Sequence, residues 1–381
     1  MADSLAHAFI IVDGHVDLPY RMKKNGFMIT KTVEDVSVET KGNFDYPKAK
    51  RGGLDAPFMS IYVPSSYQTT GGAKDFADSL IDMVSRLPQT FPDLFALANN
   101  PSDVQSNFEQ GLISLPLGME NGAPIEDDIN NVKYFYDRGI RYITLTHSKD
   151  NQICDSSYDT TYTWNGVSPF GEEVIKEMNK WGIMVDISHV TDSAAFDALA
   201  LTKAPVIASH SSCRKFTPGF ERNMPDALLQ AMAENGGVIH INFGSTFLSK
   251  ESQDKFDKMR EDLINYRTDN GLSSEDSAYV AYAQQYAIDN DVYEDIEKVA
   301  DHIDHVVNLV GIDYVGFGSD YDGVGDSLPK GMKDVSTYPN LIYELLKRGY
   351  SAEDIEKICY KNTFRVWSKV QEVAEQLQSA S

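Results

Sequence analysis

The stretch FIIVDGHVDLP, residues 9–19, decides the fold of this chain. Its apolar run at residues 9–13 has the length and β-branched content of a buried strand, and two metal-type side chains, His15 and Asp17, follow it directly. Seven further runs of this kind occur along the chain, at residues 56–63, 111–118, 142–146, 182–187, 205–208, 237–242 and 314–318. Eight strand-like runs with helical patterns between most of them predict an α/β fold, a closed (β/α)8 TIM barrel, with a doubly wound open sheet as the alternative.

One connection, between the seventh and eighth runs, is too long for a single crossover helix. Residues 244–300 in this connection are rich in Asp, Tyr, Ser and Lys, and residues 274–290 have a helical pattern. We expect a helical insertion that overhangs the barrel mouth or makes an oligomer contact, so that a homodimer stays open. No linker, repeat or low-complexity tract divides the chain, and residues 1–381 therefore predict a single domain.

The composition excludes several classes of protein. The 381 residues carry 34 Lys and Arg against 57 Asp and Glu, a net charge of −23 that repels nucleic acid. No run of apolar residues is long enough to span a membrane, and residues 1–15 lack the pattern of a signal peptide, which leaves cytoplasm and periplasm open. The cysteines, Cys154, Cys213 and Cys359, lack the spacing of a disulfide framework or a thiolate zinc site.

Five side chains at the downstream ends of the strand-like runs are candidate metal ligands, namely His15, Asp17, Glu120, His189 and His210. In a barrel, the carboxyl ends of all strands meet on one face, so these residues are expected to converge there. His15 and Asp17 are two residues apart and point to the same side if the chain is extended. Imidazole and carboxylate groups suit zinc, and five ligands are too many for one tetrahedral ion. We expect two Zn²⁺ ions bridged by Glu120, one held also by His15 and Asp17 and the other by His189 and His210.

Three further residues are candidates for catalysis and substrate binding. Asp320 follows the last run and can move a proton between the attacking water and a leaving amine. His147 follows the fourth run and can donate a hydrogen bond to a developing oxyanion, and Arg222 can clamp a substrate carboxylate. Lys149 could serve as a carbamylated bridging ligand, but Glu120 makes that unnecessary.

Each of these residues, taken singly, also has an ordinary structural interpretation. His15 and Asp17 could cap a strand end, Arg222 could form a surface ion pair, and Asp322 beside Gly323 has the composition of a turn. Agreement among the strand ends favours a metal site over these readings. The remaining histidines are interpreted as structural, and they are His7, His240, His302 and His305.

Eight motifs, in this order, give the chain a resemblance to a known family. They are DGHVDLPY (13–20), GMENG (118–122), LTHS (145–148), DISHV (186–190), SHSSCR (209–214), RNMPDALL (222–229), VADHIDHVVNLVG (299–311) and GFGSDYDGV (316–324). Together they resemble the zinc-dependent membrane or renal dipeptidases and their bacterial relatives, within the amidohydrolase superfamily. The resemblance implies two zinc ions on the five predicted ligands, with Glu120 bridging, a proton-handling role for Asp320, and contacts of His147 and Arg222 with the substrate carbonyl and carboxylate. Gly244 departs from the family, which often has a tyrosine there near the substrate carboxylate.

The leading hypothesis is therefore a binuclear zinc metallo-dipeptidase that hydrolyses L-Xaa-L-Xaa and L-Xaa-D-Xaa dipeptides by a metal-bridging hydroxide. One alternative keeps the metal chemistry and changes the substrate, giving a lactonase, a deaminase or a phosphotriesterase. The other is a non-catalytic zinc-binding protein. Arg222 favours a substrate that bears a carboxylate, and Asp320 favours an enzyme.

Overall fold

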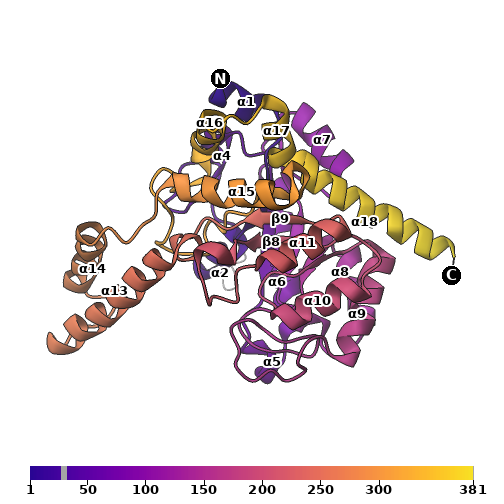
Figure 1. Ribbon diagram of the computed structural model, residues 1–381, viewed down its shortest axis with the longest axis horizontal. Coiled ribbons are helices and arrows are strands. Elements are labelled where there is room, and N and C mark those ends of the chain that lie inside the picture. Colours follow the sequence, from indigo (N-terminus) through magenta and orange to yellow (C-terminus); the bar gives the residue numbers. More distant parts are fainter. Residues whose placement is uncertain (27–31, 381) are drawn as a thin grey trace.

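Eight parallel strands close into a barrel in the computed structural model, which describes residues 1–26 and 32–380 (Figure 1). In their order around the barrel, the strands are β1 (Val12–Val16), β10 (Val315–Phe317), β9 (Val238–Ile241), β8 (Ile207–Ser211), β7 (Met184–Asp186), β6 (Ile140–Thr144), β5 (Leu117–Glu120) and β2 (Ala56–Tyr62). The predicted (β/α)8 TIM barrel is confirmed, and the doubly wound open sheet is wrong.

Helices surround the barrel, and each of them except the short α5 has buried residues. They are α1 (Ala2–Ala8), α2 (Leu18–Lys24), α4 (Tyr46–Gly52), α5 (Tyr67–Thr70), α6 (Ala73–Thr90), α7 (Pro101–Glu109), α8 (Asn130–Asp137), α9 (Pro169–Trp181), α10 (Asp192–Leu201), α11 (Asp226–Asn235), α15 (Ile296–Val310), α16 (Tyr338–Lys347), α17 (Ala352–Glu356) and α18 (Asn362–Ser379). The long α18 packs Trp367 against Phe58 of β2, with ring centroids 5.1 Å apart, and so covers the end of the barrel where the strands begin. No helix among residues 1–26 and 32–380 has both the length and the apolarity that a membrane span requires.

The third strand-like run of the sequence, residues 111–118, is divided between two sheets. Ile113–Leu115 forms β4, which pairs with β3 (Phe95–Leu97) outside the barrel, and Leu117–Glu120 forms the barrel strand β5. Pro116 stands between them, where it has no N–H to continue a ladder. The prediction of one strand over 111–118 was therefore wrong. Because the barrel strand begins after Pro116, Glu120 is the last residue of that strand and not part of a following loop.

Two other barrel strands extend further than the sequence indicates. β1 reaches Val16 and β8 reaches Ser211, so His15 and His210 lie within strands rather than after them. Each strand end has a register shift, between Asp13 and Val16 in β1 and between Ala208 and Ser211 in β8. An irregularity of this kind turns a side chain away from the simple alternation of a strand.

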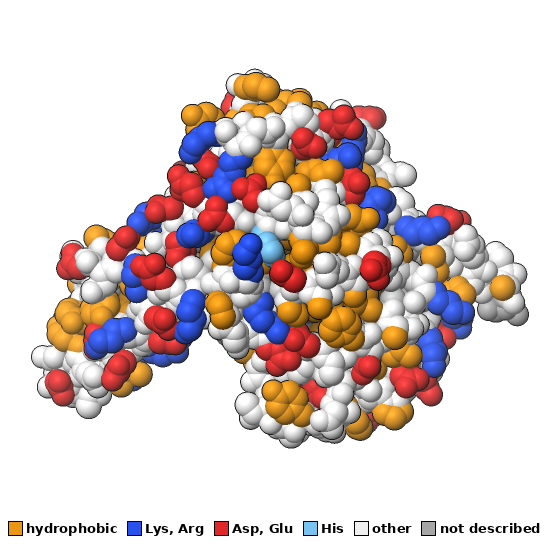
Figure 2. Space-filling view, viewed as in Figure 1, with side chains coloured by type: hydrophobic (Ala, Val, Ile, Leu, Met, Phe, Trp, Pro, Cys, Tyr) orange, Lys and Arg blue, Asp and Glu red, His pale blue; other side chains and the backbone are white. Residues whose placement is uncertain are grey.

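Residues 244–300, between β9 and β10, contain α12 (Ser245–Leu248), α13 (Lys250–Asp269), α14 (Ser277–Asp289) and the first residues of α15. α13 and α14 project together from the barrel at the left of Figure 1. Tyr266 of α13 stacks on Tyr282 of α14 with ring centroids 3.7 Å apart. Charged and hydrophobic side chains intermingle on this arm in Figure 2, and Ile288 is 69% exposed there.

The His240 side chain lies inside the barrel, and glycines of the neighbouring strands lie against it. A Cβ at Gly14 would lie 2.4 Å from the Ser209 carbonyl oxygen, and one at Gly318 would lie 2.2 Å from the same atom. These positions allow no side chain, because the neighbouring backbone cannot move away. The packed interior supports the strand ends from below and fixes where their side chains emerge.

Candidate metal centre

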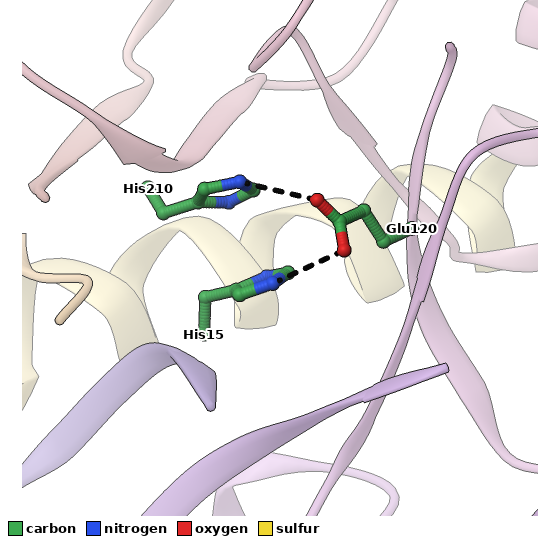
Figure 3. A group of neighbouring side chains, drawn as sticks. All are labelled: His15, Glu120 and His210. Atoms are coloured by element: carbon green, nitrogen blue, oxygen red, sulfur yellow. Dashed lines mark ion pairs between the residues drawn. The ribbon is translucent and has the colours of Figure 1, made fainter. Parts of the chain in front are cut away.

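Glu120, the last residue of β5, lies at the centre of a buried group of imidazoles. Its Oε2 is 3.4 Å from His15 Nε2, and its Oε1 is 3.4 Å from His210 Nε2 (Figure 3). The same Oε1 is 3.2 Å from His189 Nε2. The two oxygens of one carboxylate therefore face two different sets of ring nitrogens. Ser60 donates a hydrogen bond to Oε2 at 3.2 Å and helps to hold the carboxylate in this orientation.

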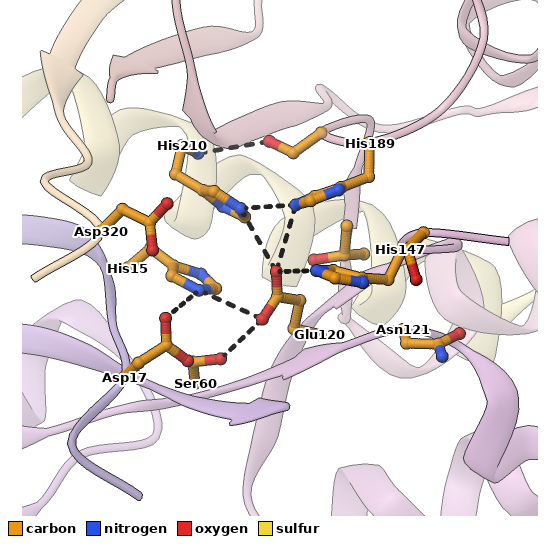
Figure 4. A network of polar contacts seen from close by, with 12 residues as sticks. His15, Asp17, Ser60, Glu120, Asn121, His147, His189, His210 and Asp320 are labelled. Atoms are coloured by element: carbon orange, nitrogen blue, oxygen red, sulfur yellow. Dashed lines mark hydrogen bonds and ion pairs between the residues drawn. The ribbon is translucent and has the colours of Figure 1, made fainter. Parts of the chain in front are cut away.

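His189 and His210 present their Nε2 atoms to each other at 2.9 Å (Figure 4). The Asp186 carboxylate accepts a hydrogen bond from Ser209 Oγ at 2.6 Å, so this hydroxyl is left to accept one from His210 Nδ1 at 2.8 Å. With its proton on Nδ1, His210 has a bare lone pair on Nε2. Two ring nitrogens and a carboxylate oxygen at this spacing form a donor set that fits a cation.

His15 and Asp17 form the second side of the group. His15 Nε2 lies 3.4 Å from Asp17 Oδ2, and neither His15 Nε2 nor Asp17 Oδ1 has a hydrogen-bond partner among the described residues. Buried polar atoms without partners are rare, and a bound ion explains them. His15 Nδ1 lies 2.8 Å from the Tyr142 hydroxyl, which orients the ring. The predicted strand geometry requires an extended backbone at Asp17, but Asp17 is instead the N-cap of α2. The side chains of His15 and Asp17 therefore converge because the chain turns into a helix.

Asp320 lies beside this second side and is buried. Its Oδ2 accepts a hydrogen bond from Asn242 Nδ2 at 2.8 Å. Burial and the neighbouring Asp17 raise the pKa of Asp320 well above its ordinary value. His15, Asp17 and Asp320 each offer one ligand atom within 4.8 Å of the others. Asp320 is therefore as close to the His15 and Asp17 donors as a ligand would be.

His147 approaches the group from the loop after β6. Its Nε2 is 3.5 Å from Glu120 Oε1, and its ring centroid is 4.3 Å from that of His189. Its Nδ1 is buried without a partner among the described residues, and burial lowers its pKa. The distances alone do not separate His147 from the predicted ligands, since Glu120, His147 and His189 also lie within 4.8 Å of one another.

The backbone at this rim has several residues in the left-handed region. φ is +70° at His189 and +61° at Asp320, and +81° at Asn121, directly after Glu120. A residue with a Cβ adopts this conformation at a cost of ~1–3 kcal/mol, and such residues cluster at functional sites. His189 and Asp320 both lie three residues beyond their strands, so the strained turns aim these side chains back over the barrel.

The charges of the group favour cation binding. Burial raises the pKa of Glu120, but His15 and His147 outweigh it, and the pKa lies well below its ordinary value. Burial lowers the pKa of His189 and of His210 well below their ordinary values, so both rings are neutral. An ionised Glu120 beside the neutral rings of His189 and His210 is the protonation state that divalent metal ions require. His15 differs: burial lowers its pKa, but Tyr142, Glu120 and Asp17 outweigh burial and hold the pKa well above its ordinary value, so this ring must release a proton before it can bind a cation.

Arg222 is buried next to the group rather than exposed in a surface ion pair. Its guanidinium donates to Ser211 Oγ and to the His210 carbonyl oxygen, each at 2.6 Å. Its Nε has no partner among the described residues, and Phe247 of α12 lies 5.4 Å from the guanidinium carbon. Two of its nitrogens thus fix the group in place, and the remaining N–H groups are left for a ligand.

A pocket of about 610 Å³ opens above the site. Its wall includes five of the residues singled out in the sequence, Asp17, Glu120, His147, His189 and Asp320. Aromatic side chains and two lysines make up much of the outer part, namely Tyr20, Tyr62, Tyr158, Phe247, Lys24 and Lys149. The insertion therefore contributes Phe247 to the pocket through α12, whereas no residue of α13 or α14 lines it.

Sequence reasoning did not identify the residues that orient the candidate ligands. They are Ser60, Tyr142, Asp186, Ser209 and Asn242, each hydrogen-bonded to a candidate site residue or, for Asp186, to one of these residues. Asp186 and Ser209 directly precede or lie close to candidate ligands in DISHV and SHSSCR, and a polar residue inside an apolar run is a usable signal there. Tyr142 and Ser60 lie inside strands at a distance from any motif, and their roles depend on the pairing of the strands.

The comparisons with known proteins show the family of the chain. A family model described as membrane dipeptidase (peptidase family M19) matches residues 1–381. The probable dipeptidase PvdM from Pseudomonas aeruginosa is similar in structure, with 25% identity, a TM-score of 0.81 and 98% of each chain covered. A metallo peptidase from Rhodobacter sphaeroides, liganded with a phosphinate mimic of the dipeptide L-Ala-D-Ala, has 22% identity and a TM-score of 0.74 over 95% of this chain and 99% of that chain. Since the family model covers the whole sequence, the chain belongs to the membrane dipeptidase family, peptidase family M19, and is a metal-dependent dipeptidase.

Proposed function

We propose that the protein is a binuclear zinc dipeptidase. The observation that carries this proposal is the position of Glu120, whose two carboxylate oxygens face separate sets of ring nitrogens. A bridging carboxylate is what two neighbouring cations need between them, because it offsets their mutual repulsion. One ion is assigned to His15, Asp17 and Glu120, and the other to Glu120, His189 and His210. When bound, the two ions lower the pKa of a shared water from ~15.7 toward ~7 and polarise the peptide carbonyl.

Asp320 is proposed to move the proton. Its carboxyl lies beside His15 and Asp17 and is oriented by Asn242. It can therefore take the proton of the attacking water. The same carboxyl then gives that proton to the nitrogen of the leaving amine as the C–N bond breaks.

His147 and Arg222 are proposed to bind the two oxygen-bearing ends of the substrate. His147 can donate a hydrogen bond to the carbonyl oxygen as negative charge develops on it. Arg222 keeps unused N–H groups beside the pocket and can bind the C-terminal carboxylate. A fixed distance between this guanidinium and Glu120 selects dipeptides, because the carboxylate of a longer peptide falls beyond reach.

One relative supports a dipeptide with a D residue at its C-terminal position. The Rhodobacter sphaeroides enzyme was solved with a mimic of L-Ala-D-Ala, and we propose that this chain accepts both L-Xaa-L-Xaa and L-Xaa-D-Xaa. A lactonase, deaminase or phosphotriesterase would have no need of the buried Arg222. A non-catalytic zinc protein would have no need of the proton-transfer residue Asp320.

Metal analysis and a dipeptide screen on the same preparation test the proposal. We expect two zinc ions per chain and hydrolysis of L,L and L,D dipeptides, with tripeptides cleaved far more slowly. Asp320→Asn should reduce kcat by about 10²–10⁴ without reducing the zinc content. Arg222→Ala should raise KM for a dipeptide but leave hydrolysis of a neutral ester unaffected. A single ion per chain, or full turnover in Asp320→Asn, would contradict the proposal.

A further inference from the structure

The outer wall of the pocket carries positive charge in a chain that is otherwise strongly acidic. Each of the four acids that line the pocket already has another partner or role. Asp17, Glu120 and Asp320 belong to the candidate metal centre, and Asp322 accepts a hydrogen bond from Arg21 Nη1 at 2.6 Å. Two lysines, Lys24 and Lys149, line the same pocket. If metal ions balance the charge of the three acids in the metal centre, the pocket mouth has a net positive charge from Lys24 and Lys149.

Lys24 lies on the pocket side of α2 because of the helical repeat. Asp17 is the N-cap of α2, and Tyr20 and Lys24 follow at intervals of three and four residues, on one face. With a rise of 1.5 Å per residue, Lys24 lies about 10 Å along the helix from Asp17. Among the described residues, no carboxylate forms an ion pair with the Lys24 ammonium, which lies 4.6 Å from the Tyr20 ring.

A continuous row of rings connects Lys24 to the metal centre. The Tyr20 ring lies 4.9 Å from the Tyr62 ring, and the Tyr62 ring lies 4.7 Å from that of His147. All of these rings line the pocket. The row forms a wall along which a substrate side chain can lie, with its apolar carbons on the rings and its end group at the ammonium.

Lys149 is a second cation at the mouth, two residues beyond His147. Its Nζ lies 3.6 Å from Asp159, and its side chain is 60% exposed. The pair is long and its lysine end is exposed, so Lys149 can exchange Asp159 for another carboxylate. Asp159 also accepts hydrogen bonds from Thr161, so it keeps partners if Lys149 turns toward a ligand.

The strand order decides which end of the dipeptide meets Lys24. Arg222 follows β8, whereas Lys24 follows β1 and Tyr62 ends β2. Two strands, β9 and β10, separate β8 from β1 around the barrel. A dipeptide whose C-terminal carboxylate is bound by Arg222 therefore extends across the centre with its N-terminal residue toward the Lys24 wall. This step rests on the proposed dipeptidase function.

We propose that the enzyme prefers dipeptides whose N-terminal residue has an anionic side chain, with Lys24 as the residue that determines this specificity and Lys149 as a supporting cation. A Glu side chain at this position reaches further along the row of rings than an Asp side chain, which is shorter by one carbon. The preference is electrostatic and partly exposed, so it weakens as ionic strength rises.

Matched dipeptides test the preference. We expect kcat/KM for Glu-Ala to exceed that for Gln-Ala by about five- to tenfold at low salt, and this ratio to fall toward one in 0.5 M salt (about 1–1.4 kcal/mol of differential binding). Ala-Glu and Ala-Gln form the second arm, in which we expect a ratio close to one. A charge preference in the Ala-Glu arm instead of the Glu-Ala arm would overturn the assignment to the N-terminal residue.

Two lysine variants complete the experiment. Lys24→Met should reduce the Glu-Ala to Gln-Ala ratio to about two or less. Lys176→Met is the control, because it removes the same charge from an exposed lysine on α9 that does not line the pocket, and it should keep the wild-type ratio. An unchanged ratio in Lys24→Met, or equal rates for both substrates in the wild type, would overturn the inference. If neither dipeptide is hydrolysed by zinc-loaded protein, the dipeptidase proposal itself fails, which is a separate result.

Discussion

Two groups of buried histidines in this barrel differ in what their ring nitrogens contact. The rim histidines, defined as His15, His147, His189 and His210, converge on Glu120, and three of them have a ring nitrogen without a hydrogen-bond partner among the described residues. The core histidines, defined as His240 and His302, have both nitrogens paired. His240 contacts the Ala208 carbonyl oxygen and Thr363 Oγ1, and His302 contacts the Cys213 N–H and the Leu248 carbonyl oxygen.

The comparison teaches that burial alone does not mark a functional histidine. Burial lowers the pKa of both core histidines to about 4, and it lowers the pKa of His189 and His210 as well. What differs is the partner of the Nε2 atoms, which face the Glu120 carboxylate in the rim histidines but contact Thr363 Oγ1 and the Leu248 carbonyl oxygen in the core histidines. A paired ring costs the fold little when it is neutral, whereas an unpaired buried nitrogen costs ~1–3 kcal/mol unless a ligand occupies it.

The largest expected effect is on the rim, in Glu120→Gln. The amide keeps the shape of the side chain but removes the charge that two cations share, so we expect kcat/KM to fall by at least about 10³ and the zinc content to fall below two per chain. His302→Gln is the matched change in the core, since its amide can accept from the Cys213 N–H and donate to the Leu248 carbonyl. It should keep both zinc and turnover, as measured by metal analysis and steady-state kinetics. Two ions and wild-type turnover in Glu120→Gln would remove the distinction between the groups.

The second effect concerns stability and belongs to the core histidines. Their folded pKa of about 4 lies below the unfolded value of ~6.5, so the unfolded chain binds more protons between these two values. Stability is therefore fully present above about pH 6.5 and is lost as the pH falls toward 4, by at most about 3 kcal/mol for each residue. Urea unfolding of the metal-free protein between pH 4 and 7 measures this. His302→Gln should remove its share of the pH dependence, and an identical profile would show that this ring does not contribute.

The sequence predicted the barrel and the position of the site better than it predicted the local geometry. The strand-like runs and the convergence of their carboxyl ends are general properties of the fold, so the grouping of His15, Glu120, His189 and His210 followed from their spacing alone. The structure brings them together by unequal means. His15 and His210 lie on strands with register shifts, and His189 lies on a left-handed turn.

The missed parts depend on contacts between distant segments. Asp17 reaches His15 as a helix N-cap and not as an extended neighbour, and Tyr142 reaches His15 from a strand 127 residues away. No periodicity within a single run contains this information. Arg222 illustrates the same limit, because its burial results from hydrogen bonds to Ser211 and to the His210 backbone that pack the loop after β8 against the strand.

A smaller effect tests how the rim histidines are held ready. Ser209→Ala removes the hydroxyl that connects His210 Nδ1 to Asp186, so the ring loses its fixed tautomer and orientation. Loss of such a supporting contact weakens metal affinity by about 10–100-fold. We expect zinc titration to show this weakening, and excess zinc to restore most of the turnover. Ser114→Ala, at a buried serine whose Oγ accepts from Asn107 instead, should leave zinc affinity unchanged. Equal affinities in the two variants would mean that Asp186 and Ser209 do not position His210.

The last prediction compares two buried carboxylates, Glu120 and Asp55. Neighbouring imidazoles keep Glu120 ionised, whereas Asp55 precedes β2 at the opposite end of the barrel, where burial raises its pKa to about 7. Its Oδ2 accepts a hydrogen bond from the Ile11 N–H at 3.1 Å, a bond that an asparagine carbonyl can also accept.

Because the folded pKa of Asp55 lies above the unfolded value of ~3.9, the native state binds more protons between these two values, and this carboxyl costs stability as the pH rises toward 7 and beyond. Asp55→Asn should therefore gain at most about 2.5 kcal/mol relative to wild type on going from pH 5 to pH 8, because the pKa of about 7 already includes the opposing effect of Lys50 and His7. Denaturant unfolding of both proteins at the two pH values measures this double difference, from which the other titrating groups cancel. A difference of zero would mean that Asp55 is ionised in the folded protein like an exposed acid, and that a buried carboxylate in this barrel needs no cation to remain charged.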